Sequence, residues 1–193
     1  MPEKETIIAA YDRLSRAVAG NGTLFVCGNG RSAADGEHIV GELMKSFRKK
    51  RPINSEGYRR LGVFGDGGIR LQHILEGTIR AVALTSHPAL STAFANDREP
   101  SAVFAQQLYG LASPGDILLA VSTSGNSENC CLAAITAKAM DLPVVALTWE
   151  KESRLSALTD VTVRVPETET YKVQELHLPV YHCLCAMLEE EFF

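Results

Sequence analysis

The sequence predicts an α/β fold, a doubly wound five-stranded parallel sheet flanked by helices. Short apolar runs alternate with amphipathic stretches along the chain, the pattern of a parallel sheet wrapped by helices. The apolar runs show no clean alternation of polar and apolar residues, as expected of strands that are buried on both faces. A length of 193 residues fits one domain, so we expect a single domain over residues 1–193.

Five runs rich in Val, Ile or Leu are the predicted strands: Thr23–Cys27, Ala81–Thr85, Ile117–Ser122, Val144–Thr148 and Val161–Val165. The predicted helices lie before, between and after them: Glu3–Val18, Ala33–Phe47, Ser101–Leu111, Ser127–Met140, a short helix near Lys151–Leu158, and Tyr171–Glu190. The sequence Gly20-Asn21-Gly22 is a typical end for the first helix.

Residues 53–80 do not follow this alternation of short apolar runs with amphipathic stretches. Glycines puncture the segment at Gly57, Gly62, Gly65, Gly67 and Gly68, and Arg59, Arg60 and Arg70 make it locally basic. Glycine clusters of this kind are typical of loops. We therefore expect an insertion or long mobile loop between the first two units of the sheet.

Composition excludes some classes of function. A formal net charge of -4 argues against nucleic-acid binding driven by overall charge. No apolar run approaches the roughly 20 residues that span a bilayer, and the N-terminus carries no uninterrupted hydrophobic targeting stretch. The five cysteines are scattered and form no Cys-x-x-Cys pair. We therefore expect reduced, mostly buried thiols and a cytoplasmic location.

The strongest candidate for a ligand site follows the third predicted strand. The sequence Ser122-Thr123-Ser124-Gly125-Asn126-Ser127 combines four hydroxyl groups, one glycine and the start of a helix. Hydroxyls and backbone N–H groups can surround phosphate oxygens without a lysine, with the helix dipole as the positive partner. A simple helix cap would account for one or two hydroxyls. The loop therefore favours a phosphate cradle.

Two other turns carry polar residues. In Cys27-Gly28-Asn29-Gly30-Arg31-Ser32, two glycines let the backbone approach a ligand, and Ser32 could cap the next helix. The third glycine of a dinucleotide fingerprint is missing, and a plain tight turn fits this sequence equally well. Asn96-Asp97 follows the stretch Ala89–Ala95, and such a pair is commonly a turn or a helix N-cap.

Histidines and carboxylates on two predicted helices form a candidate acid–base or metal cluster. His38 and Glu42 are four residues apart, hence about 40° apart around a helix, and could bind one metal ion or exchange protons. A histidine and a glutamate that form an ordinary pair on the surface of a helix would show the same spacing, so the spacing alone does not establish a functional role. Gln174 and His182 are separated by eight residues, about 12 Å along a helix. Pro179 could bend the helix between them, whereas the apolar neighbours of His182 also fit a core histidine.

Four blocks of sequence, in order, resemble the phosphoheptose isomerases of the sugar isomerase (SIS) domain superfamily. They are CGNGRSAADGEHIVGEL, ALSTAFAND, DILLAVSTSGNSENCCLAAITAKAMDLPVVALT and KVQELHLPVYH. The resemblance implies a flavodoxin-like SIS domain and an aldose–ketose isomerase. It implies conversion of sedoheptulose 7-phosphate to D-glycero-D-manno-heptose 7-phosphate through a zinc-assisted enediolate. It also implies a homo-oligomer, either a tetramer with active sites at subunit interfaces or a dimer.

The resemblance also implies a role for individual residues. The zinc ligands of the family fall on His38, Glu42, Gln174 and His182, and Glu42 and His182 become the acid–base pair. The positions that contact the phosphorylated sugar fall on Asn29, Gly30, Arg31, Asn96, Asp97, Ser122, Thr123, Ser124, Ser127 and Gln174. We add Ser32 from the chemistry of the first turn. Arg31 replaces the usual glycine of the family and brings a large cation to the turn.

Two other functions fit the sequence. A non-catalytic SIS protein could sense a sugar phosphate or bind a protein partner such as the replication initiator, and the basic, glycine-rich segment 53–80 favours this reading. The retained His38, Glu42, Gln174 and His182 argue against it, because a binding module needs no acid–base pair. Alternatively, the enzyme could act on another sugar phosphate, with Arg31 and residues 53–80 reshaping the sugar end of the site.

Overall fold

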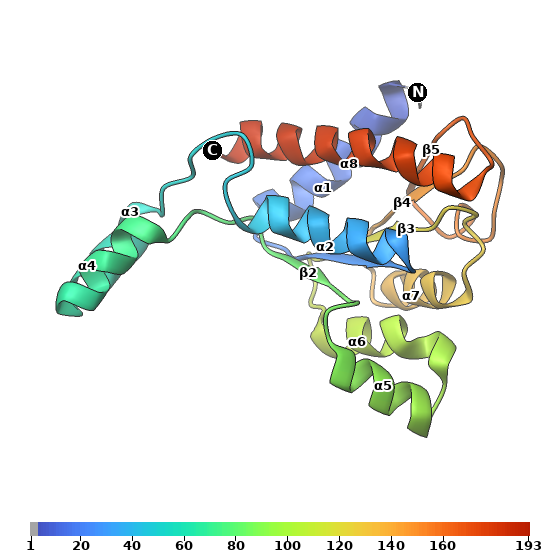
Figure 1. The fold of residues 1–193 in the computed structure, drawn as a ribbon, viewed down its shortest axis with the longest axis horizontal. Coiled ribbons are helices and arrows are strands. Elements are labelled where there is room, and N and C mark those ends of the chain that lie inside the picture. The colour runs from blue at the N-terminus through green and yellow to red at the C-terminus, as the bar shows by residue number, and fades with distance from the viewer. Residues whose placement is uncertain (1–3) are drawn as a thin grey trace.

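The strands form one parallel sheet, as expected (Figure 1). The structure is a computed structural model that describes residues 4–193. Its strands are β1 (Leu24–Gly28), β2 (Ala81–Ala83), β3 (Ile117–Val121), β4 (Val144–Thr148) and β5 (Val161–Arg164). They lie in the order β2-β1-β3-β4-β5, and every neighbouring pair is parallel. The prediction of five strands is therefore confirmed, and no strand end differs from its predicted position by more than two residues.

Helices cover both faces of the sheet. The helices of the described chain are α1 (Lys4–Ala19), α2 (Arg31–Met44), α3 (Ser55–Gly62), α4 (Gly65–Ile74), α5 (Pro88–Asp97), α6 (Val103–Leu111), α7 (Glu128–Ala139) and α8 (Thr170–Phe192), with a short 3-10 turn, η1 (Pro100–Ala102), before α6. One hydrophobic core joins the sheet to α1, α2 and α8, and the other joins it to α6 and α7. Glu3, where the first helix was expected to begin, lies outside the described residues.

The central strands β1, β3 and β4 are largely apolar because each one feeds both cores, whereas the edge strand β5 contributes to the first core alone and carries Thr162 and Arg164. Along β3, Ile117, Leu119 and Val121 belong to the core under α1, α2 and α8. Leu118 and Ala120 point to the opposite core. Successive side chains of a strand alternate between the two faces, so a strand covered on both sides has no polar position. This explains the continuous apolar runs in the sequence.

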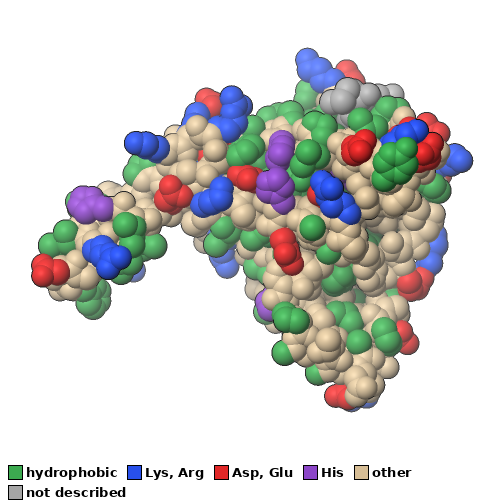
Figure 2. Space-filling view, in the orientation of Figure 1, with side chains coloured by type: hydrophobic (Ala, Val, Ile, Leu, Met, Phe, Trp, Pro, Cys, Tyr) green, Lys and Arg blue, Asp and Glu red, His purple; other side chains and the backbone are tan. Residues whose placement is uncertain are grey.

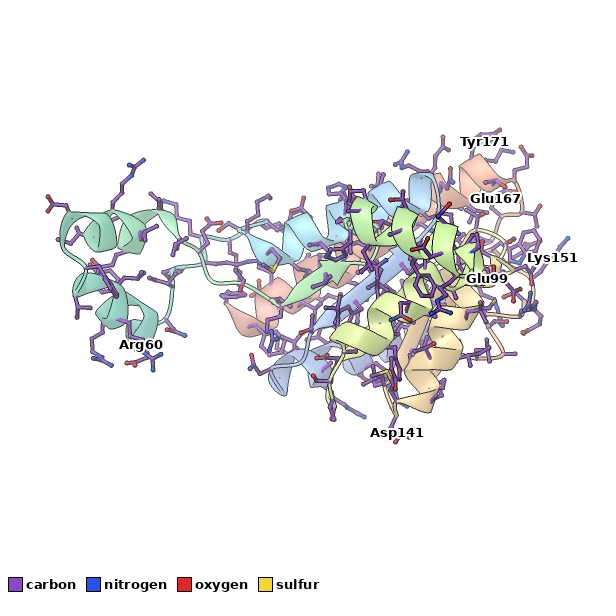
Figure 3. All side chains as sticks on the ribbon, turned by 90° about the horizontal axis from the view of Figure 1, so that it is seen from below. Arg60, Glu99, Asp141, Lys151, Glu167 and Tyr171 are labelled. Carbon is purple, nitrogen blue, oxygen red and sulfur yellow. The ribbon has the colours of Figure 1, made fainter. Side chains whose placement is uncertain are left out.

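Residues 53–80, where we expected an insertion or a long mobile loop, contain a helical hairpin. The prediction of a long loop is therefore wrong, and the insertion stays a prediction. Helices α3 and α4 stand away from the sheet at the left of Figure 1. Figure 3 shows the same separation from below, with Arg60 on the hairpin and Lys151 at the other end of the molecule. The glycines have structural reasons: Gly65 adopts a φ of 62° between the helices, and a Cβ on Gly68 would lie 1.9 Å from the Leu61 carbonyl oxygen. They therefore indicate a tight turn and close helix packing rather than mobility.

Other local expectations are confirmed or corrected. The segment 151–158 forms turns rather than a short helix. All five cysteines are free thiols, and four of them are buried, as expected. Among residues 4–193, each helix is too short or too polar to cross a membrane.

Candidate active site

The first turn, Cys27–Ser32, and the loop Ser122–Ser127 follow the adjacent strands β1 and β3, where the winding of the sheet reverses. β1 and β3 are adjacent, with Gly28 opposite Val121, and the helices that follow them, α2 and α7, pack on opposite faces. In sheets of this strand order, ligands bind at this switch point, beyond the carboxyl ends of the strands. An amide pair links the two loops: Asn29 and Asn129 donate to each other's side-chain oxygens at 2.8 Å.

The loop 122–127 has free donors at the start of α7. The Ser122 hydroxyl donates to Ser127 Oγ at 3.2 Å. Within residues 4–193, the backbone N–H groups of Thr123, Ser124 and Ser127 donate no hydrogen bond. Free N–H groups, hydroxyls and a helix N-terminus are the elements of an anion site. The predicted cradle therefore has suitable donors, although its role in binding stays a prediction.

The connection between β4 and β5 supports this loop from behind. Trp149 N–H donates to the Thr123 carbonyl at 2.9 Å, and Leu155 N–H donates to the Gly125 carbonyl at 2.9 Å. Gly125 has a φ of 64°, and a Cβ there would lie 2.1 Å from the Ser153 hydroxyl oxygen. Glycine is therefore required at this position for both backbone conformation and space. Hydrogen bonds from the β4–β5 connection thus hold the carbonyls of Thr123 and Gly125 in place.

The first turn differs from expectation at Ser32. Gly30, with a φ of 55°, is the N-cap of α2, so Ser32 lies inside the helix and is buried rather than capping it. The helix begins two residues earlier than predicted because glycine accommodates the turn before it. The Arg31 guanidinium folds back onto its own helix, with Nε donating to Asp35 Oδ1 at 3.0 Å. The side chain of Arg31 is half exposed.

The Asn96-Asp97 pair is also placed differently from expectation. These residues form the last turn of α5 rather than a turn or N-cap before a helix. Asn96 Nδ2 donates to Asp97 Oδ1 at 2.9 Å, and both side chains are exposed. In the described part of the chain, no hydrogen bond links either side chain to the other predicted site residues. The role of this pair in substrate binding therefore stays a prediction.

A cavity of about 360 Å³ lies beside the first turn, between α2, α5, η1 and α7. Its polar lining includes predicted residues Asn29 and Gly30, together with Thr85, Ser91, Thr92 and Asn129, which sequence reasoning missed. Asn129 could have been found, because it stands two residues after the hydroxyl-rich loop. Thr85, Ser91 and Thr92 carry no pattern that separates them from ordinary polar residues.

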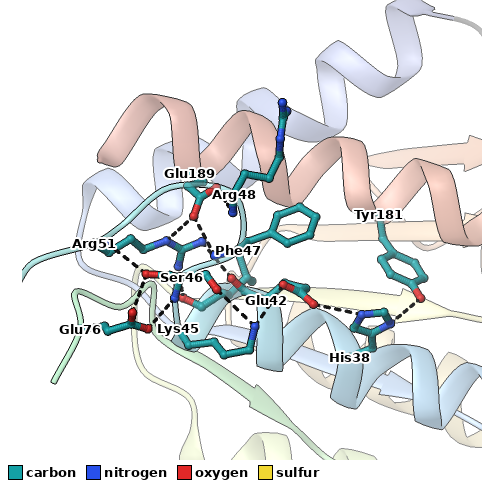
Figure 4. A network of polar contacts seen from close by, with 11 residues as sticks. His38, Glu42, Lys45, Ser46, Phe47, Arg48, Arg51, Glu76, Tyr181 and Glu189 are labelled. Carbon is teal, nitrogen blue, oxygen red and sulfur yellow. Dashed lines mark hydrogen bonds and ion pairs between the residues drawn. The ribbon is translucent and has the colours of Figure 1, made fainter. Parts of the chain in front are cut away.

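The candidate acid–base cluster lies between α2 and α8 (Figure 4). His38 Nε2 is 3.1 Å from Glu42 Oε1, and His38 Nδ1 is 3.1 Å from the Tyr181 hydroxyl. The rings of His38 and His182 pack edge to face with centroids 5.0 Å apart. Figure 2 shows histidine side chains gathered at the surface between these two helices. The structure therefore brings three of the four predicted ligands together.

Burial and neighbouring charge tune the groups of this cluster. Burial, and then the nearby His38, lower the pKa of His182. His182 Nε2 is buried and has no hydrogen-bond partner in the described part of the chain. Burial, and then the Asp35 carboxylate, raise the pKa of Tyr181. An unpaired imidazole nitrogen of lowered basicity suits a ligand or an acid–base group.

Gln174 does not join the other three candidates. α8 runs without interruption from Thr170 to Phe192, with Pro179 inside it. The Gln174 side chain is partly buried and makes no hydrogen bond with residues in the described part of the chain. Among residues 4–193, no three His, Cys, Asp or Glu side chains already stand close enough to hold a metal ion. The four-ligand set therefore stays a prediction.

Comparisons with known proteins identify the family. A model described as the SIS domain matches residues 64–148. The phosphoheptose isomerase of Chromohalobacter salexigens is 34% identical over 190 residues, which cover 97% of this chain and 84% of that protein. Solved phosphoheptose isomerases from Neisseria gonorrhoeae and Francisella tularensis match with TM-scores of 0.78 and 0.79 at 29% and 28% identity, each over 97% of this chain and 86% of the other. The chain therefore belongs to the phosphoheptose isomerase family of SIS-domain aldose–ketose isomerases.

Proposed function

We propose that the protein interconverts sedoheptulose 7-phosphate and D-glycero-D-manno-heptose 7-phosphate. The observation that carries this proposal is the hydroxyl-rich loop 122–127 at the switch point of the sheet, with free N–H donors, in a chain of this family. The loop would hold the phosphate, and the cluster between α2 and α8 would act on the carbons at the other end of the sugar. Phosphate binding fixes the orientation of a substrate whose reacting carbons lie far from it.

The reaction requires a proton to move between adjacent carbons through an enediolate. We assign the removal of this proton to the Glu42 carboxylate, which keeps 12% of its side chain exposed on the open side of α2. We assign proton exchange with the sugar oxygen to His182, whose ring packs edge to face against that of His38 in the same cluster. His38 holds Glu42 in place through the 3.1 Å contact on the same face of α2.

We propose a zinc ion as the cofactor of this site. Imidazole and carboxylate groups are ordinary zinc ligands, and the 3.1 Å separation of His38 Nε2 and Glu42 Oε1 lets both atoms share one ion. The unpartnered Nε2 of His182 would supply a third donor, and Gln174 would be the fourth ligand. When bound, zinc would supply polarisation of the carbonyl and stabilisation of the developing oxyanion.

Metal removal tests this function. We expect turnover of sedoheptulose 7-phosphate to fall to background after chelation and to return with zinc, because the carbonyl loses its electrophile. The measurement is product formation by the chelated and the zinc-loaded protein, over a panel of sugar phosphates with five to seven carbons. Full activity in the chelated protein would contradict the zinc site. Turnover of only a shorter sugar would contradict the proposed substrate.

We further propose that the chain forms a homo-oligomer, a dimer or a tetramer. The projecting hairpin exposes large apolar side chains, among them Val63 and Phe64, each 74% exposed, and hydrophobic surface is visible on it in Figure 2. Apolar surface of this kind is typical of contacts between proteins. Light scattering after gel filtration is expected to give at least twice the monomer mass of 20.9 kDa. A monomer at working enzyme concentration would contradict the proposal.

A further inference from the structure

The amide pair that joins the first turn to α7 has two different edges. Asn29 Nδ2 donates to Asn129 Oδ1, and Asn129 Nδ2 donates to Asn29 Oδ1, both at 2.8 Å. The two amides therefore form a closed ring. One edge of this ring consists of Asn29 Nδ2 and Asn129 Oδ1. The other consists of Asn29 Oδ1 and Asn129 Nδ2, and we call it the open edge.

Cys130 occupies the first edge and fixes the orientation of both amides. Its N–H lies in the first turn of α7, where helical acceptors are missing, and donates to Asn129 Oδ1 at 3.0 Å. Its Sγ lies 3.9 Å from Asn29 Nδ2 as a weak acceptor. Because a backbone N–H requires an acceptor, the amide atom beside it is the oxygen of Asn129. The assignment of the other three amide atoms follows from this one.

The open edge is left for a ligand. Asn29 and Asn129 both line the cavity of about 360 Å³ beside the first turn. Within residues 4–193, Asn29 Oδ1 and Asn129 Nδ2 make no hydrogen bond except the one that joins them. An amide oxygen has two lone pairs and an amide nitrogen has two hydrogens. The open edge therefore offers one acceptor and one donor, 2.8 Å apart.

The rest of the cavity wall provides shape more than polar contacts. Ala33, Ala95 and Phe104 form apolar parts of the lining. The hydroxyl of Thr85 already donates to a glutamate on α2 at 3.3 Å, and that of Thr92 donates to a carbonyl of its own helix at 2.7 Å. In pockets of this kind, a small number of placed polar groups fixes the orientation of the ligand.

We propose that the open edge binds hydroxyl groups of the sugar, and that Asn129 is a binding residue which selects sugars by these hydroxyls. A hydroxyl both donates and accepts, so it matches an edge with one acceptor and one donor. The oxygens of a phosphate are acceptors and would face the lone pair of Asn29 Oδ1. Asn129 follows the loop 122–127 by two residues, which assigns to it hydroxyls near the phosphate. This inference rests on the proposed function for the identity of the sugar.

Analogues of sedoheptulose 7-phosphate that each lack one hydroxyl test this inference. In the wild type, loss of a hydroxyl that the open edge binds should weaken binding about 10-fold, because the amide groups are left unpaired. In Asn129→Ala, that analogue should bind as tightly as the parent sugar phosphate. The measurement is the dissociation constant of the parent and of each analogue, by calorimetry. Equal ratios of analogue to parent in the wild type and in folded Asn129→Ala would overturn the proposal.

The matched control is Asn54→Ala. The Asn54 side chain accepts the N–H of Gly57 at 2.7 Å at the start of α3, so this variant also removes an amide from the beginning of a helix. Helix α3 belongs to the hairpin that stands away from the sheet (Figure 1). Its ratios of analogue to parent should equal those of the wild type. A change of the same size in Asn54→Ala would overturn the assignment to Asn129.

A second variant keeps the test decisive if Asn129→Ala does not fold. Asn129→Ser retains a hydroxyl, which can accept an N–H group at the start of a helix, but it is too short to close the amide ring. It lacks the amide donor of the open edge and should lose the same discrimination between parent and analogue. Wild-type ratios in folded Asn129→Ser would overturn the proposal.

Sugar phosphates with five to seven carbons separate this inference from the proposed function. The wild type could bind another member of this panel in place of sedoheptulose 7-phosphate, with discrimination among its analogues lost in Asn129→Ala. That result would contradict the proposed substrate and support the role of Asn129. Turnover of sedoheptulose 7-phosphate with wild-type ratios in Asn129→Ala would support the function and overturn the inference. A wild type that binds no sugar phosphate would overturn both.

Discussion

Glu42→Gln should lower the kcat for sedoheptulose 7-phosphate by about 100-fold or more, the range found for removal of a general base. The amide has the volume of the carboxylate but cannot accept the proton from the sugar carbon. Glu42 is the only carboxylate that contacts His38 in residues 4–193, so no neighbour on the described chain can replace it at that position. The measurement is kcat at saturating substrate and zinc.

The control for this variant is Glu190→Gln, which removes a carboxylate from α8 that pairs with Lys49 at the surface. Its kcat should equal that of the wild type. Zinc content, measured alongside, separates the two roles of Glu42: a variant that keeps zinc but loses turnover identifies the base, and one that loses both identifies a ligand. Wild-type turnover by Glu42→Gln would contradict both roles.

The sequence predicted the elements whose signal is local. The central strands were found because each is covered on both faces and is therefore largely apolar. The loop 122–127 was found because hydroxyls are concentrated between a strand and a helix. The spacing of His38 and Glu42 predicted a shared face, and the two side chains are in contact. For these features, nearby residues carry the whole pattern.

Features that depend on distant partners could not be predicted. Tyr181 lies in an apolar stretch and looks like a core residue, because its hydrogen bonds go to α2, more than 140 positions earlier. The glycines of residues 53–80 looked like loop residues because the sequence does not show that Gly68 packs against Leu61. Ser32 looked like a helix cap because the positive φ of Gly30, which starts the helix earlier, appears only in the structure.

A buried ion pair holds α8 against the end of the helix that carries Glu42. Arg51 Nε donates to Glu189 Oε1 at 2.7 Å, and both side chains are fully buried. The Arg51 guanidinium also donates to the carbonyls of Leu43 and Glu42 at 2.8 and 2.9 Å (Figure 4). Glu189 accepts the N–H groups of Phe47 and Arg48 at 2.9 and 2.8 Å. The same two side chains thus bind the end of α2, the segment that follows it, and α8. We therefore expect the loss of either partner to lower the stability of the fold strongly.

Glu189→Gln should lower the free energy of unfolding by about 3–5 kcal/mol, because it leaves the buried Arg51 charge without a counter-charge. The measurement is equilibrium unfolding in urea near neutral pH. Glu190→Gln again serves as the control, because it breaks an exposed pair with Lys49 and should cost less than about 1 kcal/mol. A loss of similar size in both variants would contradict a special role for the buried pair.

The same carboxylate should make stability depend on pH in acid. Burial alone would raise the pKa of Glu189, but the N–H groups of Phe47 and Arg48, together with Arg51, outweigh it and lower the pKa from 4.5 to about 2. Because the folded pKa lies below the unfolded one, the stabilisation is complete above about pH 5 and is lost as the pH falls toward 2. Such a shift corresponds to about 3 kcal/mol. The difference in unfolding free energy between wild type and Glu189→Gln should therefore become smaller as the pH falls through this interval. A difference that stays constant from pH 6 to the acid limit of folding would show that the ionised carboxylate is not the source of the stability.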